Sequence, residues 1–451
     1  MSNNPKTPHH SILKPYPAYK PSGLPQNADW IGAIPEGWAV SKAKKELFFT
    51  VGKTPSSGKD DYYDGGDYNW ANISDLKSKY ISEAKTKITL QAIKKFGMKP
   101  CVEGSLLFSF KLSVGLVSIA KIPLYTNEAI ASFRPGSNFS IEWAYYALPE
   151  YLIHNARPNI YGALLLNRNK IENAIIIFPP LSEQRAIAGW LDVECGKIDE
   201  AVKAQEELLA LLDEKRSALI SHTVTKGLNP AALLKPSGHP WIGPIPAHWE
   251  VKPLKKLVNQ ISLKSSSVDE IKIGLENIEG WTGRYIPTES EFEGNGINFI
   301  KGDILFGKLR PYLAKSWIAS FNGEAIGDFI VIRCKEAKLF NKYLNFFILT
   351  KDFIQQVNGL CFGAKMPRID WLGLSSQLAP LPPLSEQKAI AAYLDEECGK
   401  IDELKQAAQE AIALLKEKRS ALISAAVTGK IDVRNLAPQP SLSTDSSTPS
   451  R

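Results

Sequence analysis

The chain of 451 residues has little of the chemistry from which metal or disulfide sites are built. It contains only five cysteines, none in a CxxC pair or a Cys/His cluster. This pattern indicates neither a disulfide framework nor a zinc site, and we expect no metal in the chain. The sequence has no run of roughly 18 apolar residues, the length that is needed to cross a membrane. Its N-terminus lacks an apolar signal core. The sequence therefore predicts a cytoplasmic protein with reduced cysteines.

Several motifs of nucleic-acid enzymes are also missing. The sequence has no glycine-rich methyl-donor loop and no (D/N)PP(F/Y) motif of adenine methylation. It has no GxxxxGK(S/T) phosphate loop and no HExxH zinc motif either. We therefore predict no catalytic residue in this chain.

Two segments of 47 residues are near copies of each other. Residues 179–225 read PPLSEQRAIAGWLDVECGKIDEAVKAQEELLALLDEKRSALISHTVT, and residues 382–428 read PPLSEQKAIAAYLDEECGKIDELKQAAQEAIALLKEKRSALISAAVT. Aligned without a gap they share 33 identical positions, which indicates an internal repeat. Related openers precede them, WIGAIPEGWAV from Trp30 and WIGPIPAHWEV from Trp241. The chain is thus a pseudo-twofold repeat of two units, each closed by one copy.

Both copies have the pattern of long helices, because apolar residues recur at spacings of three and four. Each stripe could pack on its own domain only, but two near-identical stripes favour an antiparallel coiled coil between the helices. Gly196 and Gly399 lie within the pattern, and we expect a kink or short break there. The residues predicted to pack between the helices are Ile198, Val202, Leu209, Leu212, Leu219, Ile401, Leu404, Ile412, Leu415 and Leu422.

The net charge of +7 is unevenly distributed along the chain. Residues 21–178 and 229–381 each carry +4, whereas residues 179–228 carry −3 and residues 382–433 carry −2. Basic globular segments suit a polyanion, and the acidic helices are unlikely surfaces for one. A charge of +4 over some 150 residues is modest, so it supports this interpretation without deciding it.

A polar segment in the first unit predicts an exposed loop. Residues 52–76, GKTPSSGKDDYYDGGDYNWANISDL, combine Gly, Pro, Ser and Asp with lysine and aromatic residues. Lysine and tyrosine side chains here could contact phosphates or bases. For Trp70 we expect instead that the ring anchors the loop to the core.

Each unit also has a segment that predicts two strands with basic residues at the turn between them. These are GSLLFSFKLSVGLVSIA at 104–120, with Lys111, and GDILFGKLRPYLAKSWIA at 302–319, with Lys308 and Arg310. Such residues can clamp phosphates or read guanine, although basic residues beside strands are usually just solvated. A further basic loop precedes the prolines of each unit.

These motifs, in this order, resemble the specificity subunits of type I restriction-modification systems. The resemblance covers about residues 30–433 and rests on both PPLSEQ helices, the GKTP…YYDGGDYNWANISDL loop and GDILFGKLRPYLAK. It implies a mixed α/β fold with two target recognition domains, separated and closed by the two helices. We predict an N-terminal arm (1–20), domain 1 (21–178), a central helical region (179–228), domain 2 (229–381), a C-terminal helical region (382–433) and a disordered tail (434–451).

The resemblance also implies a non-catalytic subunit that recognises a bipartite asymmetric DNA target and directs adenine methylation or cleavage by its partners. Domain 1 has no arginine at the place of Arg310, so the two domains should read different half-sites. Expected partners are double-stranded DNA, two methyltransferase subunits and, through the complex, restriction and translocase subunits. These partners are expected to use S-adenosylmethionine, ATP and magnesium, with no cofactor in this chain. The residues predicted to face DNA are Lys53, Thr54, Ser57, Lys59, Tyr62, Lys111, Lys308, Arg310, Tyr312, Lys365 and Arg368.

Two other functions remain open from the residues alone. One is a DNA nuclease or methyltransferase that acts by itself, and the other is a duplicated protein-interaction scaffold. Assays of the purified chain for methyl transfer, cleavage and duplex binding distinguish the three.

Overall fold

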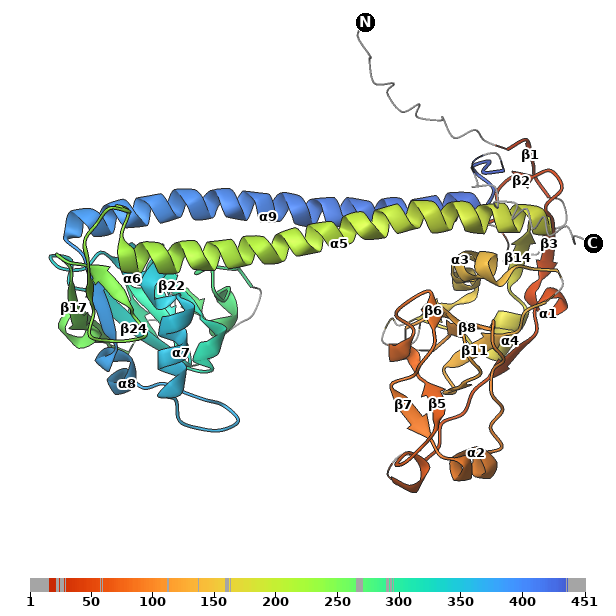
Figure 1. Cartoon of the computed structure of the whole chain (residues 1–451), viewed down its shortest axis with the longest axis horizontal. Helices are drawn as coiled ribbons and strands as arrows, with labels where there is room; N and C mark the ends of the chain where they lie inside the picture. Colours follow the sequence, from red (N-terminus) through yellow and green to blue (C-terminus); the bar gives the residue numbers. More distant parts are fainter. Residues whose placement is uncertain are drawn as a thin grey trace, which may run out of the picture. The chain divides into compact units, whose positions relative to one another are not determined.

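Contacts between residues divide the chain into two compact units, and each long helix contributes to both. Unit 1 comprises residues 1–203 and 412–451, and unit 2 comprises residues 204–411. The long helices are α5 (Leu181–Lys226) and α9 (Leu384–Val427), drawn in Figure 1. The division falls within α5 after Lys203 and within α9 after Ala411, so each helical region is shared between the two units. The computed structural model describes residues 16–21, 24, 28, 30–56, 58, 60–111, 113–136, 138–158, 162, 164–264, 271–288, 292, 294, 296–434 and 436.

The domain of unit 1 contains a five-stranded and a three-stranded sheet (Figure 1). The larger sheet is antiparallel except where β6 pairs with β9, and its order is β4 (Phe49–Val51), β11 (Ile130–Phe133), β8 (Leu106–Ser109), β9 (Val117–Ala120) and β6 (Tyr80–Ile81). The smaller sheet has the order β10 (Tyr125–Thr126), β5 (Tyr68–Ala71) and β7 (Thr86–Ile88). The other strands form pairs: β1 (Ala18–Tyr19) with β2 (Ile34–Pro35), β3 (Ala39–Lys42) with β14 (Ile175–Phe178), and β12 (Arg157–Pro158) with β13 (Leu164–Leu165). The shorter helices are α1 (Ala43–Glu46), α2 (Leu90–Phe96), α3 (Ile141–Leu152) and α4 (Arg168–Glu172).

Unit 2 repeats this plan with a four-stranded and a three-stranded sheet. The larger sheet is antiparallel, with the order β18 (Val258–Ile261), β24 (Phe329–Cys334), β21 (Ile304–Gly307) and β22 (Ser316–Ile318). The smaller has the order β19 (Lys272–Ile273), β23 (Gly323–Ala325) and β20 (Ile297–Phe299). Two pairs remain, β15 (Leu234–Pro236) with β16 (Pro244–Pro246) and β17 (Glu250–Pro253) with β25 (Leu378–Leu381). The shorter helices are α6 (Asn341–Ile348), α7 (Lys351–Gly359) and α8 (Trp371–Ser376).

The strand pairs predicted on either side of the basic turns are confirmed in both units. Strand β8 pairs antiparallel with β9, and β21 pairs antiparallel with β22. All four residues of β8 and of β21 are buried, because each is an inner strand of its sheet. The turns that follow β8 and β21 therefore start from fully buried strands.

A carboxylate at the start of each long helix holds the opener of the same unit. In unit 1, Trp38 donates its indole NH to Glu183 Oε2 at 2.8 Å. In unit 2, Trp249 donates to Glu386 Oε2 at 2.8 Å. The second tryptophan of each opener is thus matched to the glutamate of each PPLSEQ motif. This contact explains why both segments recur together.

The glutamine of each PPLSEQ motif is buried and joins the helix to its domain. Gln184 accepts from the Ser140 NH at 2.8 Å and donates to Pro179 O at 2.9 Å. Gln387 accepts from the Phe340 NH at 2.8 Å and donates to Pro382 O at 2.9 Å and to Lys338 O at 3.0 Å. The backbone NH that donates to the glutamine lies immediately before α3 in unit 1 and before α6 in unit 2. Each glutamine therefore satisfies buried backbone groups that would otherwise lack partners.

The far end of each long helix packs on the domain of the other repeat. Tyr151 of α3 donates its hydroxyl to the carbonyl of Val427, near the end of α9. Tyr343 of α6 donates to the carbonyl of Val224, the equivalent position of α5, at 3.0 Å. Each unit is thus built from one domain, the start of one long helix and the end of the other.

Ion pairs join the two long helices within each unit. In unit 1, Arg419 of α9 lies against Asp199 of α5, with Nε 2.8 Å from Oδ1. In unit 2, the equivalent residues are Arg216 of α5 and Asp402 of α9, with Nε 3.7 Å from Oδ1. Unit 1 pairs the first part of α5 with the last part of α9, and unit 2 does the reverse. The helices are therefore antiparallel, as predicted.

The buried and half-buried positions of both helices follow a seven-residue pattern, with one correction to the predicted set. Leu404 is 56% exposed, so the prediction that it packs between the helices was wrong. It lies one residue before Lys405, whose half-buried side chain occupies the position expected to pack, and Ala408 is the next buried residue. Of the others, Ile198, Leu212 and Ile401 are buried, and Val202, Leu209, Leu219, Ile412, Leu415 and Leu422 are half-buried.

Both long helices run through their glycines without the expected break. A glycine costs about 1 kcal/mol against alanine in a helix. Burial of Cys195 and Ile198 around Gly196, and of Cys398 and Ile401 around Gly399, outweighs that cost. Within the described part of the chain, no helix is both long and apolar enough to span a membrane.

Candidate nucleic-acid interface

In unit 2, strand β21 leads into a tight turn that carries the predicted basic residues. The Lys308 NH donates to Asp328 O at 2.8 Å, which fixes the start of the turn. Arg310 has a φ of 49°, in the left-handed region that is costly for a residue with a side chain. A short 3-10 helix, η7 (Pro311–Leu313), follows and ends the turn. The side chains of Arg310 and Tyr312 are exposed.

A second loop, residues 361–369, is hydrogen-bonded to this turn. The Arg310 NH donates to Pro367 O at 2.7 Å, and the Ile369 NH donates to Lys308 O at 3.0 Å. These bonds bring together five predicted DNA-facing residues that are far apart in the sequence. They are Lys308, Arg310, Tyr312, Lys365 and Arg368.

One carboxylate lies among these cations. Asp328 pairs with Arg368 at 2.9 Å from Nη2 and with Lys308 at 3.9 Å from Nζ. Arg310 and Lys365 are both exposed, and neither side chain forms a hydrogen bond or ion pair within the described residues. The positive charge of these two side chains is therefore the least neutralised of the cluster. Sequence reasoning missed Asp328, because nothing in its local sequence indicates that it faces the turn.

Unit 1 has the same backbone frame with different side chains. The Leu166 NH donates to Phe110 O at 3.1 Å, just as Ile369 does to Lys308. Phe110 is buried, so the first unit has no cation at the place of Lys308. Lys111, one residue later, is exposed and lies over the Phe110 ring with Nζ 5.6 Å from the centroid. The preceding strand pair, β12 and β13, is joined by residues that are only partly described.

Lys53 and Thr54 begin the aromatic-rich segment of unit 1, and both make contacts inside the domain. Lys53 donates its ammonium to Phe96 O at 2.8 Å, at the end of α2. The Thr54 hydroxyl donates to the Glu128 carboxylate, and this bond lowers the pKa of Glu128. Both residues are exposed, so these contacts position them without removing them from the surface.

Tyr62 is a correction to the predicted DNA-facing set. Its side chain is only 3% exposed and forms a small core with Phe96, and Lys95 donates to its hydroxyl at 2.7 Å. A buried ring of this kind cannot reach a groove, so Tyr62 is a structural residue. Its polar neighbours in the sequence suggested that the side chain is exposed, but the ring packs against Phe96 and is buried. Ser57 and Lys59 lie outside the described residues.

The predicted loop at 52–76 also contains regular structure. Residues 68–71 form β5, an inner strand of the smaller sheet. Trp70 is 8% exposed and donates its indole NH to Lys53 O at 3.0 Å, which confirms that it anchors the segment. Lys53 is thus held by Trp70 through its backbone and by α2 through its side chain.

The described residues of both units offer no metal site at these turns. No group of three His, Cys, Asp or Glu side chains among them is arranged to hold a metal ion. What the unit 2 turn does offer is a rigid backbone with exposed arginine, lysine and tyrosine. Such groups can donate to phosphates and to base edges.

Comparison with known proteins identifies the family. Residues 35–205 and 285–413 match the type I restriction modification DNA specificity domain. The MjaVIII specificity subunit of Methanocaldococcus jannaschii is 26% identical over 429 residues, which cover 89% of this chain and 95% of that protein. The EcoDI specificity subunit of Escherichia coli is 24% identical over 300 residues, which cover 61% of this chain and 67% of that protein.

A solved structure described under complex assembly and conformational transition of the type I R-M system has the same fold. Its chain superposes with a TM-score of 0.66 at 16% identity, over 88% of this chain and 99% of that chain. The matched segments cover most of both units, including the turns and the starts of the long helices. This chain therefore belongs to the type I restriction-modification specificity subunits, the DNA-recognition components of these systems rather than their catalytic subunits.

Proposed function

We propose that each domain reads one half of a bipartite DNA target and that the two halves differ in sequence. One observation carries this proposal: both domains present a turn and a loop in the same backbone frame, but with different side chains. Lys308, Arg310 and Arg368 surround the frame in unit 2, whereas Phe110 and Lys111 occupy it in unit 1. Because base identity is read by individual donors and acceptors, different side chains select different bases. Mapping the adenines methylated by the complete complex tests for a two-part, asymmetric target.

Arg310 is the residue that we expect to read a base in the second half-site. Replacing it with alanine should weaken binding to the target by about 5- to 150-fold, since a bidentate base contact contributes about 1–3 kcal/mol of discrimination. Binding to an unrelated duplex should change little. Arg310→Lys keeps the charge but loses the planar fork, so it should restore only part of the affinity. Fluorescence anisotropy with both duplexes measures the effect.

The matched control is Lys255→Ala, which removes an exposed cation of unit 2 at the 3-10 helix Leu254–Lys256. It should bind both duplexes as the parent chain does. An equal loss on target and unrelated DNA for Arg310→Ala would show that this residue contacts only phosphates.

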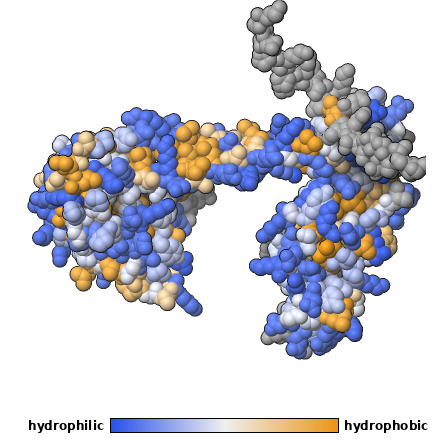
Figure 2. All heavy atoms as spheres, viewed as in Figure 1, coloured by the Kyte–Doolittle hydropathy of each residue, from blue (hydrophilic) through white to orange (hydrophobic). Residues whose placement is uncertain are grey.

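We also propose that two methyltransferase subunits bind the chain, one at each repeated helix surface. Leu211 of α5 and Leu414 of α9 occupy equivalent positions, and they are 63% and 66% exposed. Figure 2 shows apolar side chains exposed along these otherwise polar helices. A large apolar side chain kept exposed at the same place in both copies is a suitable centre for a protein contact. Near-identical surfaces should bind the same partner twice.

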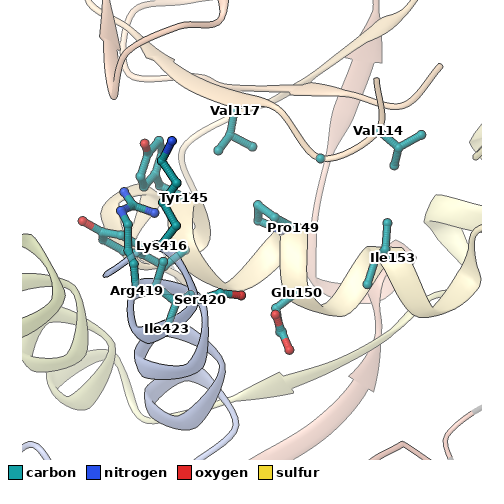
Figure 3. A pocket seen from close by; sticks show the side chains of 12 residues that line it. Val114, Val117, Tyr145, Pro149, Glu150, Ile153, Lys416, Arg419, Ser420 and Ile423 are labelled. Atoms are coloured by element: carbon teal, nitrogen blue, oxygen red, sulfur yellow. The ribbon is translucent and has the colours of Figure 1, made fainter. Parts of the chain in front are cut away.

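A cavity recurs where each helix end meets a domain. In unit 1 it measures about 560 Å³, and Figure 3 shows residues of α3 and α9 around it, with Tyr145 beside Lys416 and Arg419. In unit 2 a cavity of about 730 Å³ lies beside the end of α5. Four pairs of equivalent helix residues line the two cavities: Asp213 and Lys416, Arg216 and Arg419, Ser217 and Ser420, Ile220 and Ile423. The repeat thus gives each unit a similar concave surface, which supports two equivalent partners.

Replacing either exposed leucine with glutamate should prevent one methyltransferase subunit from binding. Leu211→Glu and Leu414→Glu should each reduce the bound methyltransferase from two subunits per chain to one, because a charge would be buried without a counterion in that contact. The double variant should bind none. Light scattering of the reconstituted complexes gives the stoichiometry.

Leu233→Glu is the control, because Leu233 is 83% exposed and lies outside the long helices. It should leave two subunits bound. Retention of both partners by the double variant would place the contact elsewhere.

The remaining chemistry belongs to the partners in this proposal. Methyl transfer would use S-adenosylmethionine in the methyltransferase subunits, and ATP and magnesium would serve restriction and translocase subunits. This chain would supply no cofactor site. The complex would act in the cytoplasm, where chromosomal and incoming DNA are accessible.

A further inference from the structure

The loop of residues 361–369 exposes large apolar side chains beside the basic residues of the unit 2 turn. Phe362 is 58% exposed and Met366 is 53% exposed. Lys365 and Arg368 are exposed in the same loop, and Arg310 is exposed in the turn to which it is bonded. Single exposed apolar residues are common, but two of them in one short loop with exposed cations are typical of an interaction site.

Backbone hydrogen bonds close this loop. The Phe362 NH donates to Arg368 O at 3.0 Å, and the Arg368 NH donates back to Phe362 O at 2.9 Å. Gly363 has a φ of 90°, and a Cβ there would lie 3.1 Å from Met366 O. Together with the Arg310–Pro367 bond, these contacts fix the positions from which Phe362 and Met366 project. A preorganised loop loses little entropy on binding.

We propose that Phe362 and Met366 contact the C5-methyl group of thymine in the major groove of the second half-site. This inference rests on the proposed function of unit 2. Apolar side chains gain from contact only where the partner offers an apolar group, and the thymine methyl is the apolar group on a base edge in that groove. The surrounding cations suit the phosphates on either side. The pair thus adds recognition of thymine next to the base contacted by Arg310.

The test replaces thymine with deoxyuridine, which removes only the methyl group. Each thymine of the second half-site, in the target found by methylation mapping, is changed in turn. The full-length chain should lose about three- to tenfold in affinity at one or more positions, the value of one buried methyl group. Phe362→Ala and Met366→Ala should bind thymine DNA more weakly and should lose that sensitivity to deoxyuridine. Deoxyuridine in the first half-site should change the affinity of the parent chain and of both variants by the same factor.

The control variant is Leu372→Ala, because Leu372 is 75% exposed on α8 of the same unit. It should keep both the affinity and the sensitivity of the parent chain. If the parent chain binds its target specifically but every deoxyuridine duplex equally well, the inference is overturned while the proposed function stands. If Phe362→Ala and Met366→Ala lose affinity but stay sensitive to deoxyuridine, the side chains act otherwise, for example as wedges between base steps, and the inference is also overturned. Failure of the parent chain to bind any mapped target would overturn both.

Discussion

Replacing Gln387 with alanine is expected to lower the free energy of unfolding by about 3–5 kcal/mol. Gln387 is fully buried, and its amide serves the Phe340 NH, Pro382 O and Lys338 O. A buried polar group left without a partner costs about 1–3 kcal/mol. Alanine would leave the buried Pro382 O and the partly buried Phe340 NH and Lys338 O without the glutamine. The truncation also leaves a cavity where the helix joins the domain. Urea unfolding followed by circular dichroism measures the change.

Gln406→Ala is the matched control on the same helix. Gln406 is exposed, and its amide contacts only Glu410 within the described residues. Its loss should change stability by less than about 0.5 kcal/mol. Gln184→Ala in unit 1 should behave as Gln387→Ala does, because it loses the equivalent bonds. A Gln387→Ala chain as stable as the control would show that this junction does not hold the helix to the domain.

The long helices could be predicted from the sequence because their signals are local or repeated. Apolar spacing indicated the face of each helix that packs, and the 47-residue repeat indicated that the two helices are equivalent and could pack antiparallel. The prediction assigned Leu404 to the packing position because it is the apolar neighbour of Lys405. One residue along a helix turns a side chain by about 100°, so Leu404 faces away from the other helix. The roles of Glu183 and Gln184 were not predictable, because Trp38 and Ser140, to which they bond, lie more than 40 residues away and no local pattern indicates them.

The turn of unit 2 was only partly predictable. Its two strands follow from alternation, and the structure confirms them with Lys308 and Arg310 in the turn between them. The pairing of the 361–369 loop with Arg310 depends on backbone bonds between segments about 60 residues apart, which the sequence does not encode locally. The prediction that Tyr62 faces DNA was wrong because its local sequence is polar, whereas its ring is buried in a core.

Exchanging domain 2, residues 229–381, for that of another family member should replace the second half-site completely and leave the first unchanged. The physical reason is that the residues proposed to read bases in unit 2 all lie within this segment, whereas those of unit 1 lie outside it. Each mismatched base pair costs about 1–3 kcal/mol, so four or more altered positions would abolish binding to the original target. The helices stay the same in the exchanged protein, and so do the residues proposed to bind the methyltransferase.

The exchanged segment must keep the contacts at the two ends of domain 2. Leu378–Leu381 pairs with Glu250–Pro253 inside domain 2, so both strands must move together. Trp249 should also be retained, because it donates its indole NH to Glu386, and the residue at 340 should not be proline, because its backbone NH donates to Gln387. A chain exchanged in this way should unfold at a urea concentration close to that of the parent.

The most direct measurement is to map methylated adenines in DNA exposed to the parent complex and to the complex with the exchanged domain. We predict two-part targets that share the first half-site and differ throughout the second. A change in both halves, or in neither, would contradict the claim that each domain reads its own half of the target.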